Sequence, residues 1–278
     1  MNTLQVEGVG LMAPGLAGWS HGRAVLSGAR PYVAEAMPTA IAALLPANER
    51  RRTTATVKLA LQVAQEAALQ ADIDPSTTPT VLASSGGDSE VLDKICAALT
   101  LPDRPVSPTH FHHSVHNTPA GYWSIATRCA AASLSLSAYD DSFAAGLMEA
   151  AALAWTDRTR VLLIAYDLPP PFPLSERRAI VAPFAVALVL NPAPTRRRLA
   201  TLRLARNAKQ PASRLDDPPL EALRLGNPAT LIDLSGMADL RGIRRNGDTL
   251  SIGAMTRHSE VARSAEVRSA IPALAVLA

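Results

Sequence analysis

The sequence has little cysteine, no marked excess of charge and no long hydrophobic run, and each shortage excludes a class of protein. Its two cysteines, Cys96 and Cys129, give neither a disulfide framework nor enough sulfur for a zinc cage, so we expect both to be reduced thiols. The 27 Lys and Arg residues against 24 Asp and Glu leave a net charge of +3 that is spread along the chain. This distribution does not predict nucleic-acid binding.

The longest apolar run, residues 179–190, contains Pro183 and is well short of the ~20 residues that cross a bilayer. The N-terminus lacks a positively charged region and carries an early acid, Glu7, so neither a secretory nor a mitochondrial signal fits. We therefore expect a cytoplasmic protein without a membrane span. A composition of 48% hydrophobic and 18% charged residues predicts a folded chain with a sizeable core.

The pattern along the chain is typical of an α/β protein. Apolar residues at helical spacing predict a core-facing helix over 54–71 that is capped by Thr53 or Thr54. Alternating or continuous apolar runs predict strands, and further helical patterns follow two of them. We expect strands over 4–12, 80–84, 133–138, 160–166, 184–190 and 199–204, and further helices over 90–99 and 138–155.

The composition of the sequence changes after Asn191, where proline, arginine and polar residues become frequent. We interpret 199–222 as partly linker, with its most linker-like stretch over 207–219. Beyond it, Asn246-Gly247 between alternating residues predicts a type I′ hairpin, and a short helix is expected to begin at Thr256. The tail therefore reads as a small α+β appendage.

Four of the six histidines, His110, His112, His113 and His116, lie close together in the sequence. Imidazoles are common zinc ligands, but the segment lacks a helical metal motif such as His-Glu-x-x-His, and a loop rarely fixes three imidazoles around one ion. We therefore predict no metal, and interpret the segment as a loop packed on a partner.

The order and spacing of several motifs resemble the N-terminal half of β-ketoacyl synthases. These motifs are the glycine-bearing opening, Ser85-Gly-Gly-Asp, His116-Asn-Thr-Pro-Ala-Gly-Tyr-Trp and the alanine-rich helix with its following strand. Residues 112–127 and 141–150 further resemble short chain length factors of aryl polyene clusters. The resemblance covers residues 1–228 and implies a thiolase-like half, with a mixed sheet between two helical layers.

For the mechanism, the resemblance implies a cysteine thiolate at the N-terminus of a buried helix, together with two histidines that stabilise an enolate. Cys129 is the candidate, but it lies 8 residues after Gly121 and 32 before Val161, whereas active ketosynthases have a longer first interval and a shorter second one. A helix that begins near Tyr139 gives intervals of 18 and 22, as the family requires. This alignment places Tyr139 or Asp140 at the nucleophile position.

The family's two catalytic histidines belong to a C-terminal half that this chain does not resemble, and His258 matches neither of their motifs. The resemblance therefore implies a chain length factor without catalytic residues and without independent activity. Such a subunit pairs with a catalytic β-ketoacyl synthase, works with an acyl carrier protein and helps to set product length in polyene or fatty-acid-type synthesis. The rival interpretation is an acyltransferase that uses Cys129 with His112, His113 or His116 as base.

The tail resembles a different family, the FAD-binding medium subunit of molybdenum hydroxylases of the carbon monoxide and xanthine dehydrogenase type. Residues 223–243, 251–262 and 271–275 carry this resemblance, and Gly253, Ala254 and Thr256 match positions beside the flavin. Both glycine-rich loops that hold the FAD pyrophosphate in that family lack a counterpart, so we expect no cofactor. Residues 229–278 are then a truncated fragment, joined to residues 1–228 by fusion or by a reading-frame artefact. A FAD-binding redox subunit is the third interpretation.

Overall fold

The structure is a computed structural model that describes residues 3–204, 213–214, 232–233, 241–247, 249–253, 256, 258–271 and 274. The predicted boundary between residues 228 and 229 lies outside the described residues, as does Ala254. The elements in chain order are β1 (Thr3–Ala13), β2 (Leu16–Ala17), α1 (Trp19–Leu26), α2 (Ala47–Arg52), α3 (Ala55–Ala71), β3 (Thr80–Ala83), α4 (Ser89–Leu99), α5 (Pro108–His113), α6 (Thr118–Thr127), β4 (Ser133–Leu136), the 3-10 helix η1 (Tyr139–Asp141), α7 (Ser142–Asp157), β5 (Val161–Asp167), α8 (Leu174–Arg177), β6 (Phe184–Asn191), β7 (Ala200–Arg203), β8 (Ser213–Arg214), β9 (Ile232–Asp233), β10 (Ile243–Asn246), β11 (Thr249–Ile252), α10 (His258–Arg263) and α11 (Ala265–Ala270).

A mixed seven-stranded sheet forms the centre of the body. Its order is β2-β1-β6-β5-β3-β4, and β7 pairs with β1 beside β2. Strands β3, β4 and β5 are parallel to one another, whereas β6 runs antiparallel to both of its neighbours, β5 and β1. The carboxyl ends of β3, β4 and β5 therefore meet at one edge of the sheet.

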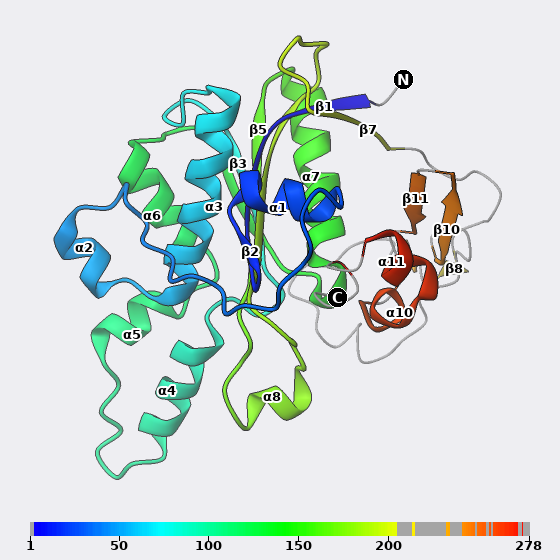
Figure 1. Cartoon of the computed structure of the whole chain (residues 1–278). Helices are drawn as coiled ribbons and strands as arrows, with labels where there is room; N and C mark the ends of the chain where they lie inside the picture. Colours follow the sequence, from blue (N-terminus) through cyan, green and yellow to red (C-terminus); the bar gives the residue numbers. More distant parts are fainter. Residues whose placement is uncertain are drawn as a thin grey trace.

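Helices cover both faces of this sheet and give the body three layers (Figure 1). Helices α3 and α6 pack on one face, and α7 packs on the other. Strand β5 serves both layers, because Leu162 and Ile164 belong to the core under α3 and α6, while Val161 and Leu163 belong to the core under α7. This explains the continuous apolar run in the sequence, since a strand buried on both faces has no polar side to show.

Two glycines in β1 allow α3 to touch the strand backbone directly. A Cβ atom at Gly8 would lie 2.2 Å from the carbonyl oxygen of Ala67, and one at Gly10 would lie 1.9 Å from that of Val63. Both distances are far inside van der Waals contact. Any larger residue at Gly8 or Gly10 would therefore push α3 away from the sheet.

The helix and strand predictions for the body are confirmed, with shifts at their ends. Thr54 caps α3, because its side chain accepts a hydrogen bond from the backbone N–H of Val57. Pairing of β6 begins at Phe184, directly after Pro183, as expected of a residue that cannot donate to a ladder. The helix predicted from residue 138 instead opens with the 3-10 turn η1 and continues as α7.

The interpretation of the histidine segment as a loop is wrong. His110, His112 and His113 lie on helix α5, and His116 lies in the connection to α6. Prolines at the first positions of both helices explain the difference, because proline there is pre-set for a helical backbone and loses no hydrogen bond. The sequence pattern hides these helices because both are short.

The described part of the tail contains the predicted hairpin, shifted by one residue. Asn246 pairs with Thr249, so the connection consists of residues 247 and 248, and Asn246 belongs to strand β10. Gly247 has a φ of 59°, the left-handed conformation that a tight hairpin requires. Val261 and Val267 of the two helices pack with Ile243 and Leu250 of the hairpin in a small separate core.

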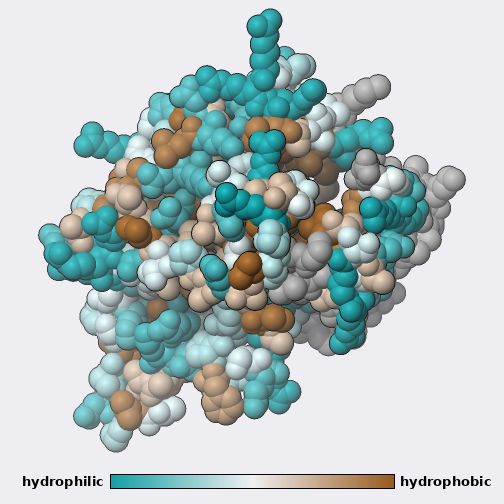
Figure 2. Space-filling model, in the orientation of Figure 1, coloured by the Kyte–Doolittle hydropathy of each residue, from teal (hydrophilic) through white to brown (hydrophobic). Residues whose placement is uncertain are grey.

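The surface on the side of α1 and β2 is mixed in character (Figure 2). Hydrophilic residues predominate there, and apolar residues occur in small separate patches. Among the residues that the structure describes, no helix has the length and apolarity needed to span a membrane.

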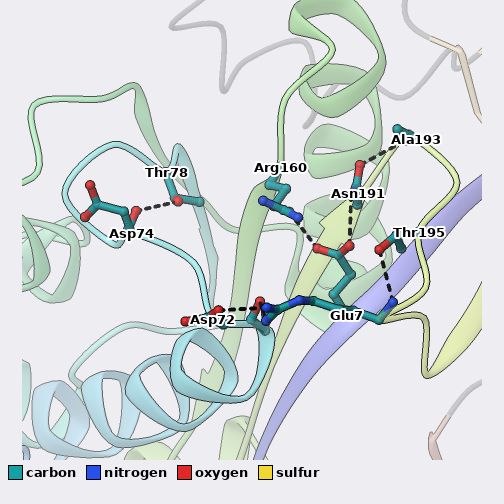
Figure 3. Close-up of polar contacts among 10 residues, drawn as sticks. Glu7, Asp72, Asp74, Thr78, Arg160, Asn191, Ala193 and Thr195 are labelled. Carbon is teal, nitrogen blue, oxygen red and sulfur yellow. Dashed lines mark hydrogen bonds and ion pairs between the residues drawn. The ribbon is translucent and has the colours of Figure 1, made fainter.

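A buried carboxylate, Glu7, joins three strands at one end of the sheet (Figure 3). It lies at the register shift in β1, accepts a hydrogen bond of 2.9 Å from Asn191 Nδ2 and pairs with Arg160 Nε at 2.6 Å. Burial by itself raises the pKa of the Glu7 carboxyl, but hydrogen bonds from Asn191 and Arg160 outweigh it and hold the pKa below its ordinary value. The carboxylate therefore stabilises the fold in its charged form.

We expect Glu7→Gln to lower the free energy of unfolding at neutral pH by about 1–3 kcal/mol, because hydrogen bonds to a charged acceptor are lost. A depressed folded-state pKa contributes stability above the ordinary glutamate pKa of about 4.3, and this contribution disappears as the pH falls through the folded-state value. The difference between wild type and variant should therefore shrink below about pH 4. Urea unfolding at several pH values measures it, with the exposed Glu35→Gln as control. Equal stability of wild type and Glu7→Gln at neutral pH would contradict the assignment.

Candidate functional site

The carboxyl ends of β3 and β5 are joined by Asp167, the last residue of β5. Its carboxylate accepts hydrogen bonds from the Ser84 hydroxyl at 2.9 Å and from the Ser85 backbone N–H at 2.9 Å. The Ser84 hydroxyl oxygen in turn accepts from the N–H of Gly87 at 2.9 Å. The glycine-bearing turn after β3 is thus held by side chains of the protein itself. The turn lies beside the end of β4, because the Ser137 hydroxyl donates to the Ser85 carbonyl at 3.0 Å.

The end of β4 makes a sharp turn into α7 at Tyr139. This residue has a φ of 54°, in the left-handed region, and lies between a strand and a helix. Ser142 braces the turn, because its hydroxyl donates to the Tyr139 carbonyl at 2.7 Å and accepts from the N–H of Ala138 at 3.0 Å. A strand, a strained residue and a helix in this order form the elbow on which many enzymes present a nucleophile. Here the elbow presents a phenol, and Tyr139 is 59% exposed.

Arg178, in the loop after α8, contacts two residues of this elbow, Tyr139 and Asp140. Its guanidinium carbon lies 4.0 Å from the centroid of the Tyr139 ring, a cation–π contact, and Nη1 pairs with the carboxylate of Asp140. Burial lowers the pKa of Arg178, but the Asp140 carboxylate more than compensates and raises it above its ordinary value. Both residues predicted for the nucleophile position are therefore held by one guanidinium. Sequence reasoning missed this contact, because 38 residues separate Asp140 from Arg178 and no local pattern links them.

Cys129 lies at the opposite end of the same strands. It follows the C-terminus of α6, and its thiol donates to the carbonyl of Thr78, just before β3, at 3.6 Å. Tyr139 instead follows the end of β4, which runs parallel to β3. Cys129 is half-buried and does not lie at the N-terminus of a helix, the position that favours a thiolate.

The imidazoles of the histidine segment make different contacts, although the rings of His112 and His113 lie edge to face with their centroids 5.2 Å apart. His113 is buried, its Nε2 lies 3.2 Å from the Arg52 carbonyl and its ring stacks on Tyr122. His116 Nε2 lies 3.1 Å from the Ser84 carbonyl. Burial lowers the pKa of His113. Within the described ranges, no three His, Cys, Asp or Glu side chains come together in a group that could hold a metal ion.

A cavity of about 450 Å³ lies at the other edge of the sheet. Trp19 and Arg23 of α1, Glu66 and Gln70 of α3 and Val9 of β1 line it. Glu66 and Gln70 already accept hydrogen bonds from backbone N–H groups of β1. This cavity is separate from the elbow, because β1 and β4 lie far apart in the strand order.

In the tail, Gly253 and Thr256 close the base of the hairpin. The Thr256 hydroxyl accepts from the N–H of Gly242 at 2.9 Å and donates to its carbonyl at 3.2 Å, and the N–H of Gly253 donates to the same carbonyl. Within the fragment, the hydroxyl is committed to the backbone of the protein. This geometry does not fit a threonine that is free to contact a flavin.

Comparison with known families assigns the body of the chain. The sequence model of the β-ketoacyl synthase N-terminal domain matches residues 26–225, well over half of the chain. The chain belongs to the β-ketoacyl synthase family. A second model, for the FAD-binding domain in molybdopterin dehydrogenase, matches residues 219–278. The resemblances of both parts are therefore confirmed.

Solved structures of the family agree with this assignment. The ketosynthase in complex with its chain length factor from Xenorhabdus doucetiae is 28% identical, with a TM-score of 0.58, over 68% of this chain and 79% of that one. A second similar structure is a complex of a type II polyketide synthase acyl carrier protein with its ketosynthase. The matched chain is 14% identical, with a TM-score of 0.56, over 68% of this chain and 62% of that one. At this identity the likeness shows the fold alone. The thiolase-like α/β fold predicted from the sequence is confirmed.

The tail matches a curated relative, the carbon monoxide dehydrogenase medium chain of Hydrogenophaga pseudoflava. The two are 42% identical over 57 residues, which are 20% of this chain and 20% of that protein. The chain thus spans about a fifth of the length of the medium chain that it matches.

We expect Cys129 to react with iodoacetamide more slowly than the exposed Cys96, because its thiol is half-buried and bonded to the Thr78 carbonyl. Mass spectrometry of the two peptides over time measures both rates, and Cys96→Ser isolates that of Cys129. An activated nucleophile would reverse the order, and Cys129 would then be labelled first.

Proposed function

We propose that the body of this chain is a chain length factor that has no condensing activity of its own and pairs with a catalytic β-ketoacyl synthase. The pair would build polyene or fatty-acid-type chains, and this subunit would help to shape the tunnel that sets their length. The elbow carries the proposal, because Tyr139, in contact with Arg178, occupies the turn at which the resemblance to ketosynthases implies the nucleophile position.

The chemistry of the elbow supports a non-catalytic role. Condensation in this family needs a group that accepts the acyl chain as a thioester, and a phenol at this point does not form one. The side chain at the next position is Asp140, whose carboxylate is paired with Arg178. The alternative acyltransferase would require Cys129, whose thiol lies at the other end of the strands.

The free side of β4 supports pairing with another sheet. The backbone N–H groups of Thr80 in β3 and of Ser84 directly after it donate to the carbonyls of Ala132 and Leu136, so alternate residues of β4 face β3. The backbone groups of Ser133 and Ser135 then point away from β3, and no strand among the described residues pairs with them. An unpaired edge of this kind readily adds a strand from a partner.

Apolar side chains on the elements around this edge support the same surface. Leu134 of β4, Ile125 of α6, and Phe143 and Met148 of α7 are 41%, 68%, 43% and 61% exposed. Both helices contact β4, one on each face of the sheet. Exposed apolar residues gathered on neighbouring elements are typical of a surface that a partner covers. We call Leu134, Ile125, Phe143 and Met148 the β4 surface.

An acyl carrier protein is proposed as the second partner, because a structure with the same fold contains a ketosynthase with its acyl carrier protein. The solved structure at 28% identity is a ketosynthase in complex with its chain length factor, which supports the first partner. We propose that this pairing takes place in the cytoplasm. The aryl polyene pathway rests on the motif resemblance over residues 112–127 and 141–150.

We expect Leu134→Glu to abolish co-elution with a catalytic ketosynthase that binds the wild-type chain, because it places a charge at the β4 edge. Leu69→Glu is the matched control, since Leu69 is 71% exposed on α3, on a different surface. After co-expression, size-exclusion chromatography measures the complex, and circular dichroism checks that both variants fold.

Two results would count against the proposal. Unchanged co-elution of Leu134→Glu would exclude the β4 edge as the interface. Release of a condensation product by this chain in the absence of a ketosynthase would exclude the non-catalytic role.

We further propose that the tail binds no FAD in this chain. The Thr256 hydroxyl is committed to Gly242, and neither pyrophosphate loop of the flavoprotein family has a counterpart in the sequence. The purified protein should therefore be colourless and should not become yellow after incubation with FAD and desalting. A retained flavin absorbance would favour the redox-subunit interpretation instead.

A further inference from the structure

A small internal cavity lies where five elements of the body meet. Its volume is about 10 Å³, close to the minimum that one water molecule needs. Residues at the starts of α3 and α6, in the turn before α4, on α5 and on β5 line it, including Asp88, His113, His116 and Tyr166. This cavity is therefore just large enough for one small molecule, and its lining is rich in polar groups.

Three polar atoms of this lining have no hydrogen-bond partner among the described residues. They are Tyr166 Oη, His113 Nδ1 and Asp88 Oδ2, and each is buried. The side chains of Tyr166 and His113 are almost entirely buried, at 2% and 3% exposure. A buried polar group without a partner costs about 1–3 kcal/mol, so three such groups around one cavity require an explanation.

The hydrogen bond made by the other polar atom of His113 and of Asp88 determines whether each unpartnered atom is a donor or an acceptor. His113 Nε2 lies 3.2 Å from the Arg52 carbonyl, and a carbonyl only accepts, so Nε2 carries the hydrogen. Burial lowers the pKa of His113 and keeps the ring neutral, which leaves Nδ1 as an acceptor. Asp88 Oδ1 accepts from the N–H of Val91 at the start of α4, and Oδ2 is a second acceptor.

The cavity therefore offers two acceptors and one group, the Tyr166 hydroxyl, that can donate. Water has two hydrogens to donate and can accept one from the phenol, so it satisfies all three atoms at once. We propose that this cavity is a binding site for a single ordered water molecule, held by Asp88, His113 and Tyr166. Three hydrogen bonds are the usual number for a buried structural water.

Other occupants fit the site less well. An anion would face the carboxylate of Asp88 and the acceptor Nδ1 of His113, so it would be repelled. A multivalent metal ion would need a group of His, Cys, Asp or Glu ligands, which does not occur within the described residues. A monovalent cation such as ammonium could donate to both acceptors, and the experiment separates it from water.

The water would connect elements that are distant in the sequence. Asp88 caps α4, His113 lies on α5, and Tyr166 lies on β5, next to the Asp167 that holds the turn after β3. A bridge between them would fix the histidine-bearing segment to the end of the sheet. This inference is independent of the proposed pairing with a ketosynthase.

The first test is a crystal structure of the full chain at high resolution. We expect one spherical density within hydrogen-bond distance of Tyr166 Oη, His113 Nδ1 and Asp88 Oδ2. A cavity closed by a direct bond between Tyr166 and Asp88, or one without density, would overturn the proposal.

The second test measures coupling by urea unfolding of single and double variants. Tyr166→Phe should raise the unfolding equilibrium constant roughly five-fold, because the water loses a hydrogen bond. It should also be non-additive with Asp88→Asn, which keeps a good helix cap but changes the atom that faces the water. Tyr32→Phe is the control, since Tyr32 donates directly to the Pro14 carbonyl, and it should be additive with Asp88→Asn.

If the Tyr166 hydroxyl is a true orphan, Tyr166→Phe will leave stability unchanged or raise it, and the proposal fails. Stabilisation by ammonium or sodium chloride that tetramethylammonium chloride does not reproduce, and that Asp88→Asn removes, would identify a cation and would also overturn it.

Discussion

The contact between the backbones of β1 and α3 is the constraint on which the rest of the body depends. Gly8 and Gly10 let the helix approach until a single methyl group would no longer fit between them and the carbonyls of Ala67 and Val63. At this distance Glu66 and Gln70 of α3 reach the N–H groups of Leu11 and Val9. The helix thus packs on the strand and also supplies hydrogen bonds that a neighbouring strand would otherwise give. Helix α3 also contributes many of the buried side chains in the core between α3, α6 and the sheet.

Most of the fold was predictable from the sequence because its strands and long helices bury regular patterns. The helix over 54–71, the buried runs that became β5 and β6, and the edge strand β7 were all visible in this way. The strand order was not, since pairing of β6 with both β5 and β1 depends on contacts that no local pattern records. Helix α5 was not predicted, because six residues are too few to display a helical period.

In the candidate site, too, one feature was predictable from the sequence and the long-range contacts were not. The elbow near Tyr139 followed from the resemblance to ketosynthases, because a helix that begins there gives the intervals from Gly121 and to Val161 that this resemblance implies. The clasp by Arg178 and the pairing of Glu7 with Arg160 and Asn191 join residues far apart in sequence. A charged residue in an apolar strand, such as Glu7, is the one local sign that a partner must exist, although it does not say which residue that partner is.

At the elbow, the backbone conformation of Tyr139 does not determine the chemistry of its side chain. A non-glycine residue with a φ of 54° is strained by about 1–3 kcal/mol, and such strain usually persists at sites where it serves a function. In this chain the strained turn carries a phenol beneath a guanidinium. A strand-to-helix turn of the kind that presents a nucleophile in many enzymes is thus compatible with a phenol, because its backbone is set by the join between strand and helix.

The pairing of β7 with the first residues of β1 has a consequence for how such a gene can change. Thr3 lies opposite Arg203, so the first strand and the last strand of the sheet lie side by side, at the edge remote from β4. Chain ends that lie together are tolerant of circular permutation and of foreign sequence. Recombination after β7 can therefore graft an unrelated peptide onto this body while the far edge of its sheet stays clear.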